Sequence, residues 1–173
     1  MQDSALYEQI RDAALLEGDF LLRSGRRSKY YLDKYLFETQ PAILAELARR
    51  FAAHVDDGVD RIAGPELGGV PLATATSLQT GKPLVLIRNA KKDYGTAKQF
   101  EGRLDAGDRV LITEDIATSG GQSIEAAKLL RDGCGCTVVK IVVAIDRQEG
   151  AREAIEDAGF AFASLMTKAD LGL

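Results

Sequence analysis

The chain has 173 residues, 46% of them hydrophobic and 28% charged, which is the composition of a globular protein long enough to bury a core. Its 26 acidic and 22 basic residues give a formal net charge of −4, which argues against a general nucleic-acid binder, since such proteins usually carry a basic face. No apolar run approaches the roughly 20 residues that span a bilayer, and no charged-then-apolar leader opens the chain, so we expect a cytoplasmic protein without membrane contact.

The first part of the chain predicts a small N-terminal addition. Apolar residues at helical spacing predict a helix over 3–17, stopped by Gly18. Short β-like stretches at 19–22 and 29–33 follow, separated by a polar turn. A second long helix is expected over 41–54, because proline is favoured in a first turn.

Beyond residue 60, apolar strand-like segments alternate with helical ones. The expected strands are 61–64, 83–87, 109–113, 137–145 and 161–165, and the expected helices are 69–80, 120–132 and 149–158. Such alternation predicts a parallel twisted sheet with helices on both faces. We therefore expect one α/β domain over 1–173, with an N-terminal helix and hood segment over 1–40 and a core over 41–173.

Metal-binding side chains are scarce. Cys134 and Cys136 are the only cysteines and His54 is the only histidine, which is too few for the usual four-ligand zinc site. We expect cysteines without a metal or redox role, and no metal centre built by protein side chains alone.

The segment 110–123 carries the most informative pattern. An apolar strand ends in Glu114 and Asp115, and a Thr-Ser-Gly-Gly turn over 118–121 leads into a helix. Unobstructed backbone N–H groups, hydroxyls and a helix N-terminus suit a phosphate group, while paired acids suit ribose hydroxyls or Mg²⁺. The alternative is a simple strand-to-helix turn with solvated acids at its mouth. Ligands of parallel sheets lie beyond the carboxyl ends of the strands, which favours the phosphate site.

This segment resembles the phosphoribosyl-pyrophosphate motif of type I phosphoribosyltransferases: apolar strand, two acids, then Thr-x-Gly-Gly. The resemblance implies that the acids hold the ribose hydroxyls of 5-phosphoribosyl-1-pyrophosphate (PRPP), that Asp115 also has a catalytic role, and that 117–123 wraps the 5-phosphate. It implies Mg²⁺ as cofactor, held mainly by PRPP, with a water-mediated contact to one of the acids left open. The implied PRPP-binding residues of the segment are Glu114, Asp115, Ile116, Ala117, Thr118, Ser119, Gly120, Gly121, Gln122 and Ser123.

Two further segments suit a flat, anionic base. The stretch 22–33 resembles the N-terminal pattern of the orotate phosphoribosyltransferases, a basic residue, Ser-Gly and then paired aromatics, and it implies orotate contacts from Arg23 and Tyr31, with Arg26 as an alternative. Its simpler interpretation is a basic turn between edge strands. Thr118 is assigned to orotate as well.

The second is Asp-Arg-Gln-Glu over 146–149, at the end of the most apolar strand. A guanidinium matches a carboxylate through two parallel hydrogen bonds, and orotate is a pyrimidine that carries a carboxylate. The segment resembles one in the orotate family in which the arginine contacts the base, which implies an orotate contact from Arg147. The alternative is a helix-capping aspartate beside a surface arginine.

The segment 64–73 again predicts strand, loop and helix, and it resembles the pyrophosphate loop of the same family. The resemblance implies PRPP contacts from Glu66, Leu67 and Gly68. Many family members have a lysine where Gly68 stands. Here only backbone contacts are available at that position, so its positive charge must come from elsewhere. A plain glycine turn is the alternative.

The segment 88–102 is rich in cations and resembles the catalytic loop of the family, Arg-Lys-x-x-Lys-Asp-His-Gly with a later Glu-Gly. It implies PRPP contacts from Arg88, Lys91, Lys92 and Tyr94. Lys92 is the first choice for the catalytic cation that stabilises the leaving pyrophosphate, and Arg88 is the second. A solvated run of charges is the alternative. In the family this loop reaches the neighbouring subunit's site, which implies a homodimer that shares the 88–102 loop.

Two positions of this loop depart from the family. Asn89 stands where a lysine is usual, and Tyr94 stands where a histidine is usual. A tyrosine donates hydrogen bonds but is not a cation near neutral pH, so the histidine's role is either dispensable or replaced, for example by Lys91. Tyr94, with Asp-Lys-Tyr at 33–35 and Phe-Glu-Thr at 37–39, looks most like the archaeal branch.

The resemblance spans most of the chain and implies transfer of a phosphoribosyl group from PRPP to orotate in pyrimidine synthesis. An enzyme for another base is the nearest alternative, although the Arg-Ser-Gly and Asp-Arg-Gln-Glu segments do not favour a purine. A non-catalytic regulator that senses PRPP is the rival from another class. Such a regulator needs a part that contacts nucleic acid, and neither an added helix-turn-helix nor a basic charge balance is present in the sequence.

Overall fold

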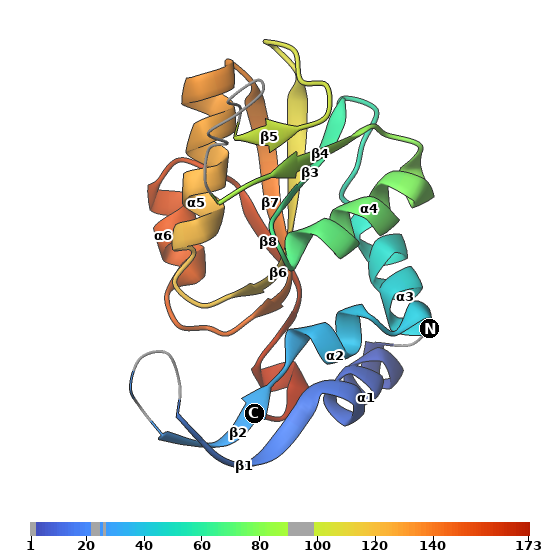
Figure 1. Cartoon of the computed structure of the whole chain (residues 1–173), viewed down its shortest axis with the longest axis vertical. Helices are drawn as coiled ribbons and strands as arrows, with labels where there is room; N and C mark the ends of the chain where they lie inside the picture. The colour runs from blue at the N-terminus through green and yellow to red at the C-terminus, as the bar shows by residue number, and fades with distance from the viewer. Residues whose placement is uncertain (1–2, 22–24, 26, 90–98) are drawn as a thin grey trace.

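A computed structural model, which describes residues 3–21, 25, 27–89 and 99–173, contains a six-stranded sheet between two layers of helices (Figure 1). The strand order is β5-β4-β3-β6-β7-β8, and all neighbours are parallel except the short edge strand β5, which is antiparallel to β4. The strands are β3 (Arg61–Pro65), β4 (Leu84–Ile87), β5 (Phe100–Glu101), β6 (Arg109–Ala117), β7 (Thr137–Asp146) and β8 (Phe162–Thr167).

Successive residues of each strand point to opposite faces, and each face has its own helices. Ile62 of β3 packs with Leu111 of β6 in the cluster covered by α3 (Pro41–Ala52) and α4 (Gly69–Thr80). Ala63 and Ile112, the next residues along, pack in a second cluster with α5 (Gly121–Lys128) and α6 (Ala151–Asp157). The predicted α/β fold with helices on both faces is therefore confirmed.

The N-terminal residues form a small layer at one end of the sheet. Helix α1 (Asp3–Ala14) leads into the antiparallel pair β1 (Leu15–Leu21) and β2 (Arg27–Leu32), and the short helix α2 (Lys34–Glu38) follows. A C-terminal 3-10 turn, Ala169–Leu171, lies against α1. Figure 1 shows this layer beneath the sheet, with the C-terminus close to β2.

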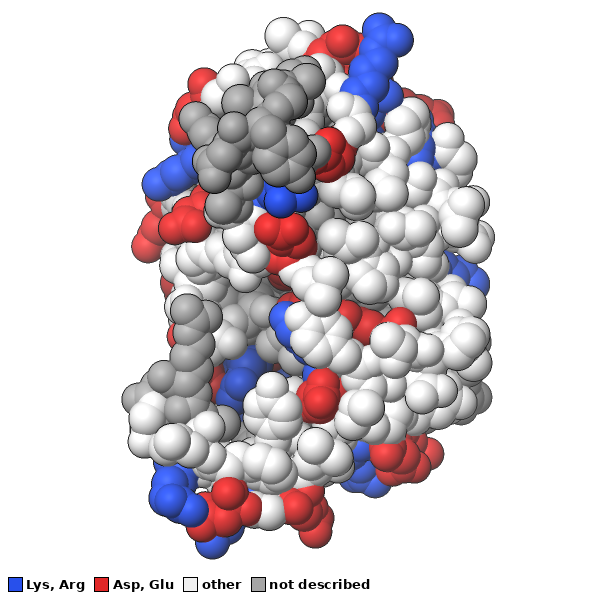
Figure 2. Space-filling model, in the orientation of Figure 1, with Lys and Arg blue, Asp and Glu red and all other residues white. Residues whose placement is uncertain are grey.

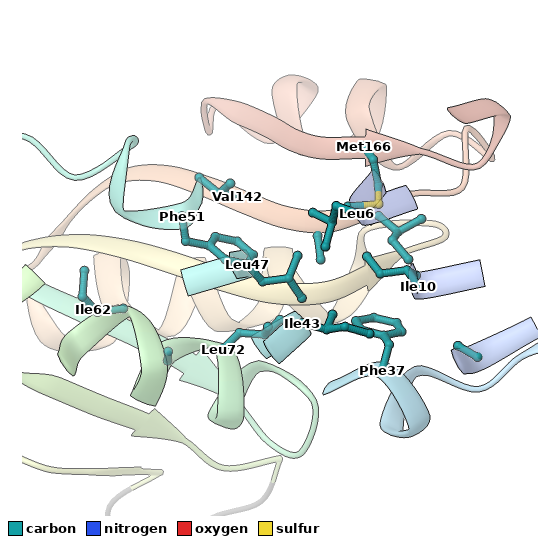
Figure 3. Close-up of a cluster of buried hydrophobic side chains, with 14 of the residues drawn as sticks. Leu6, Ile10, Phe37, Ile43, Leu47, Phe51, Ile62, Leu72, Val142 and Met166 are labelled. Carbon is teal, nitrogen blue, oxygen red and sulfur yellow. The ribbon is translucent and has the colours of Figure 1, made fainter. Parts of the chain in front are cut away.

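Apolar side chains hold this layer to the rest of the molecule. Figure 3 shows side chains of the layer and of the main sheet meeting in one buried cluster. Full burial of each large apolar side chain contributes roughly 1.5–3 kcal/mol to the free energy of unfolding. The labelled members are Leu6, Ile10, Phe37, Ile43, Leu47, Phe51, Ile62, Leu72, Val142 and Met166.

Several element boundaries differ from those the sequence predicts. The first helix ends at Ala14 instead of residue 17, because Leu15 pairs with Leu32 in the hairpin and the Asp33 N–H donates to the Ala14 carbonyl. Strand β6 runs four residues beyond the predicted 113, because its pairing with β7 continues as far as Ala117. Helix α2 and strand β5 were not predicted, since each is too short to show a period.

Two helices are also shorter than predicted. Helix α5 ends at Lys128 and continues as a π-helical turn, Leu129–Gly133. Helix α6 begins only at Ala151, because Gly150 before it has a positive φ of 96° that a helix cannot include. Within the described ranges, no helix is long and apolar enough to cross a membrane.

Candidate active site

The strand-acid-glycine segment lines a pocket at the carboxyl end of β6. All ten residues from 114 to 123 border it, together with Lys34 from α2. Gly120 makes the turn into α5 with a φ of 77°, and a Cβ there would lie 3.0 Å from Ile155 of α6. Backbone N–H groups at the start of α5 therefore face an open space of the kind that suits a phosphate group.

The two acids lie within β6 and not beyond its end. Glu114 pairs with Val143 of β7, and the Glu114 and Asp115 residues are only 5% and 2% exposed. Burial and the carboxylate of Asp115 both raise the pKa of Glu114 above its ordinary value. The interpretation of this segment as a turn with solvated acids is therefore wrong.

The Glu114 carboxylate also lacks part of its hydrogen bonding. Oε1 accepts the Asp115 N–H at 3.2 Å, whereas Oε2 is buried and has no hydrogen-bond partner among the described residues. Buried polar atoms in native proteins are nearly always paired with protein, water or ligand. Glu114 Oε2 lies at the pocket and could accept a hydrogen bond from a ribose hydroxyl, or from a water bound to Mg²⁺.

The short helix α2 adds a cation that the sequence did not assign to the site. The Asp33 carboxylate accepts the Tyr35 N–H at 3.1 Å and so fixes the start of α2. From this helix, Lys34 Nζ reaches Asp115 Oδ2 at 2.5 Å. Burial lowers the pKa of Lys34, but the attraction and hydrogen bond of Asp115 outweigh it, and the net shift is upward.

Glu38, one helical turn after Lys34, is a further buried acid that the sequence did not assign. It is 1% exposed, and neither carboxylate oxygen has a hydrogen-bond partner within the described part of the chain. Burial, together with the nearby charge of Asp115, raises the pKa of Glu38 to about 8. The spacing of four residues that places both on one helical face was the available signal, but α2 itself was not expected.

The loop over 66–68, which joins β3 to α4, lies against the acids. A Cβ at Gly68 would overlap the Asp115 carboxylate, so the space that a side chain needs there is already filled. The Glu66–Leu67 peptide bond is cis. The Glu66 carbonyl accepts a hydrogen bond from the Gln122 side chain at 2.9 Å. The predicted pyrophosphate loop and the predicted phosphate loop are therefore neighbours.

Arg88 lies beside these two loops, at the end of β4. The backbone N–H of Arg88 donates to the Gln99 carbonyl at 2.9 Å, and the side-chain amide of Gln99 donates to the Arg88 carbonyl at 3.2 Å. Its Nε is buried without a hydrogen-bond partner among the described residues, and the side chain lines a small pocket with Gln122 and Glu125 of α5.

A further pocket, beside the hairpin of β1 and β2, is lined by two of the predicted base-binding residues. Tyr31 and Arg147 line it together with Tyr30 and Lys168, whose Nζ lies 5.8 Å from the centre of the Tyr30 ring. Lys168 was not predicted. On the face shown in Figure 2, a hollow that contains basic side chains lies beside the N-terminal hairpin.

This pocket has a small volume. Its volume of about 20 Å³ holds roughly one water molecule, so a pyrimidine ring enters only if side chains move. Arg147 Nε donates to Glu149 at 3.1 Å, and this bond leaves the two terminal guanidinium nitrogens to pair with a carboxylate. Asp146 accepts the Gln148 N–H at 2.8 Å and does not cap α6, whose N-cap is Gly150. The interpretation of Asp146 as a helix cap is therefore wrong.

Four of the predicted site residues lie outside the described residues: Arg23 of the hairpin turn, and Lys91, Lys92 and Tyr94 of the cation-rich loop. Of the remaining predicted residues, the structure brings Glu66, Leu67, Gly68, Arg88, the 114–123 segment and Arg147 to the carboxyl edge of the sheet. Among the described residues, no group of three or more His, Cys, Asp or Glu side chains is arranged to hold a metal ion.

Known proteins are similar to this chain in sequence and in fold. The family described as "Phosphoribosyl transferase domain" matches residues 37–164. Two archaeal orotate phosphoribosyltransferases are similar over nearly their whole length: that of Natronomonas pharaonis is 44% identical over 172 residues, covering 99% of this chain and 98% of the relative, and that of Pyrococcus horikoshii is 45% identical over 174 residues, covering 99% and 93%.

The crystal structure of Mycobacterium tuberculosis H37Rv orotate phosphoribosyltransferase in complex with PRPP has a TM-score of 0.80 to this fold, at 32% identity and with 99% of each chain covered. The matched sequence, the parallel sheet and the acid-glycine segment at its carboxyl edge agree with one another. This chain therefore belongs to the orotate phosphoribosyltransferases, within the type I phosphoribosyltransferase family.

Proposed function

We propose that the chain transfers the phosphoribosyl group of PRPP to orotate, releasing pyrophosphate and forming orotidine 5′-monophosphate in pyrimidine (UMP) synthesis. The observation that carries the proposal is the hydrogen bond from the Arg147 N–H to the Ala117 carbonyl, at 3.0 Å. It joins the segment that suits the carboxylate of orotate to the segment that suits the ribose 5-phosphate. A base and a phosphoribosyl group bound by these two segments would be neighbours.

Each part of PRPP has residues suited to it. The backbone N–H groups and hydroxyls of 117–123 bind the 5-phosphate, and Glu114 and Asp115 accept hydrogen bonds from the ribose hydroxyls. Glu66, Leu67 and Gly68 offer backbone to the diphosphate. Arg88, with Lys91, Lys92 and Tyr94 of the loop that follows it, contacts the diphosphate from the other side.

The base is held for attack on C1 of the ribose. The terminal nitrogens of Arg147 pair with the orotate carboxylate, Tyr31 packs against the ring, and Thr118 donates to the base. Arg23 supplies a further positive charge. As the bond from C1 to the pyrophosphate oxygen breaks, C1 gains positive charge and a bond forms from it to the orotate ring nitrogen. The N–H bond of that nitrogen breaks, and its proton passes to the leaving pyrophosphate or to water.

The largest electrostatic demand is the negative charge that gathers on the leaving pyrophosphate. Lys92 is the principal cation that meets it and Arg88 is the second. Glu114 and Asp115, as the proposed partners of the ribose hydroxyls, would also be near the positive charge that develops on the ribose. Mg²⁺ bound to PRPP, with a water-mediated contact to one of these acids, would neutralise part of the diphosphate charge.

The proposal includes the organisation of the protein. The segment 1–40 acts as a hood over a core at 41–173, two chains form a homodimer that shares the 88–102 loop, and the enzyme works in the cytoplasm. Sedimentation at several protein concentrations tests the dimer: a single monomeric species across the range would exclude it.

The test of the activity is direct. Purified protein with Mg²⁺ and PRPP is mixed with orotate, and separately with adenine, hypoxanthine, xanthine and uracil, and base consumption is followed by ultraviolet absorbance. We expect loss of orotate alone. Turnover of a purine instead would show that the enzyme uses another base. PRPP binding without turnover of any base would indicate a PRPP-sensing regulator.

A further inference from the structure

Lys34 is placed by the N-terminal layer inside the pocket of the acid-glycine segment. Its Nζ lies 2.5 Å from Asp115 Oδ2, and the lysine side chain is 35% exposed while that of Asp115 is 3% exposed. Among the described residues that line this pocket, Lys34 is the only one with a positively charged side chain. A dianionic or more highly charged ligand in the pocket would meet this ammonium.

Position 68 and the Lys34 ammonium are neighbours through Asp115. The Oδ2 atom that contacts Nζ is the same atom that a Cβ at Gly68 would overlap. The two approach the pocket from different elements, Gly68 from the loop after β3 and Lys34 from α2. Gly68 has no charged side chain, but the ammonium of Lys34, a residue far away in the sequence, lies close to the same position.

The direction of the lysine argues against a role in folding alone. Glu38 lies one turn further along α2, is 1% exposed, and has two carboxylate oxygens without a hydrogen-bond partner among the described residues. Lys34 gives that acid only a longer-range attraction, without a hydrogen bond. Lys34 instead extends to Asp115 at the pocket, where its flexible stem allows the ammonium to turn to a ligand.

We propose that Lys34 is a PRPP-binding residue whose ammonium contacts the diphosphate and supplies the positive charge that Gly68 cannot. In the structure the ammonium pairs with Asp115. When PRPP is bound, the ribose hydroxyls take the Asp115 carboxylate and the ammonium turns to the adjoining diphosphate. The inference rests on the proposed function only in that PRPP is the ligand; it does not depend on which base is transferred.

The test compares three ligands by calorimetric titration in the absence of any base: PRPP with Mg²⁺, pyrophosphate with Mg²⁺, and ribose 5-phosphate, which has the 5-phosphate but no diphosphate. In Lys34→Ala, PRPP and pyrophosphate should each bind at least about tenfold more weakly, the loss typical of a hydrogen bond to a charged group. Ribose 5-phosphate should bind nearly as in the wild type. Lys128→Ala, at the far end of α5, removes one charge away from the pocket and should change none of the three.

Two further variants separate binding from folding. Lys34→Ala leaves the Asp115 carboxylate without its partner, so Lys34→Gln, which keeps most of the side-chain length, is titrated beside it and the melting temperature of each is measured. The double variant Lys34→Ala, Gly68→Lys should recover part of the lost PRPP affinity, because Asp115 is then free to rotate away from the new side chain. A purely structural role for Lys34 predicts no such recovery.

Wild-type affinity of both Lys34 variants for PRPP and pyrophosphate would overturn the proposal. An equal loss for ribose 5-phosphate would overturn it as well, because the contact would then not be to the diphosphate. Orotate turnover of the wild type is measured separately. If the wild type binds PRPP but transfers its phosphoribosyl group to another base, the proposed function fails while the assignment of Lys34 stands or falls on the titrations.

Discussion

The backbone N–H of Asn89 donates a 2.6 Å hydrogen bond to Oε1 of Glu66. Glu66 lies in the loop after β3, and Asn89 is the second residue of the cation-rich segment 88–102, which follows β4. The carbonyl of Glu66 also accepts a hydrogen bond from Gln122 at the start of α5. One residue thus joins three segments that carry proposed PRPP contacts, and its two hydrogen bonds fix the spacing between them.

Glu66→Ala should therefore weaken PRPP binding without unfolding the protein. The Asn89 N–H loses its acceptor, and a typical hydrogen bond contributes only about 0.5–1.5 kcal/mol to the free energy of unfolding. We expect the KM for PRPP to rise several-fold with a melting temperature close to that of the wild type. Glu66→Gln keeps an acceptor oxygen and serves as the matched control, which should be much less affected. Equal behaviour of the two variants would show that the Asn89 contact does not matter.

Lys92→Ala should lower turnover severely while the fold survives. Lys92 lies outside the described residues, and its proposed role is to stabilise charge on the leaving pyrophosphate. Loss of one such contact typically lowers kcat by about 10²–10³-fold. Single-turnover kinetics at saturating substrates measure this, with Arg103→Ala as the control, since Arg103 pairs with Asp105 outside the proposed site. Near-normal turnover of Lys92→Ala would remove Lys92 from the mechanism.

Arg147→Lys should impair orotate binding selectively. An ammonium keeps the positive charge but cannot form two parallel hydrogen bonds to a carboxylate. We expect the KM for orotate to rise about tenfold, as for the loss of one hydrogen bond to a charged group, while PRPP affinity measured without orotate stays unchanged. Arg152→Lys, which alters a surface pair with Glu156 on α6, is the control. A rise in the PRPP dissociation constant of the same size would contradict a base-specific role.

Glu38→Gln should change how stability depends on pH. The Glu38 carboxyl has a pKa of about 8 in the folded protein against an ordinary value of 4.5. Between these values the folded protein holds a proton that the unfolded chain has released, so at this position wild-type stability falls as pH rises. The glutamine does not ionise and removes that fall.

The measurement is urea unfolding of both proteins, without PRPP, at several pH values. The difference in the free energy of unfolding, variant minus wild type, should grow from pH 4.5 to about 8, by on the order of a few kcal/mol, and then level off. Parallel stability curves across this range would mean that Glu38 is not held in its neutral form.

The alternation of strands and helices and the place of the main motifs could be predicted from the amino-acid sequence alone. The place of residues 114–123 and of Arg147 at the carboxyl edge of the sheet was predictable, because each motif is contiguous and lies at the end of an apolar strand, and the carboxyl ends of parallel strands meet at one edge. The same local signals failed at element boundaries. Strand β6 continues through the acids because of its pairing with β7, a contact between distant residues that no local period reveals.

The residues that surround those motifs could not be predicted from local patterns, because they come from distant parts of the chain. Helix α2 is five residues long, too short to show a helical period, yet its packing places Lys34 against Asp115 and buries Glu38 nearby. The contact between Glu66 and Asn89 depends in the same way on two loops that come together in the fold. Charge, burial and hydrogen bonding at such sites depend on which distant side chains share a volume, and the folded chain alone fixes that.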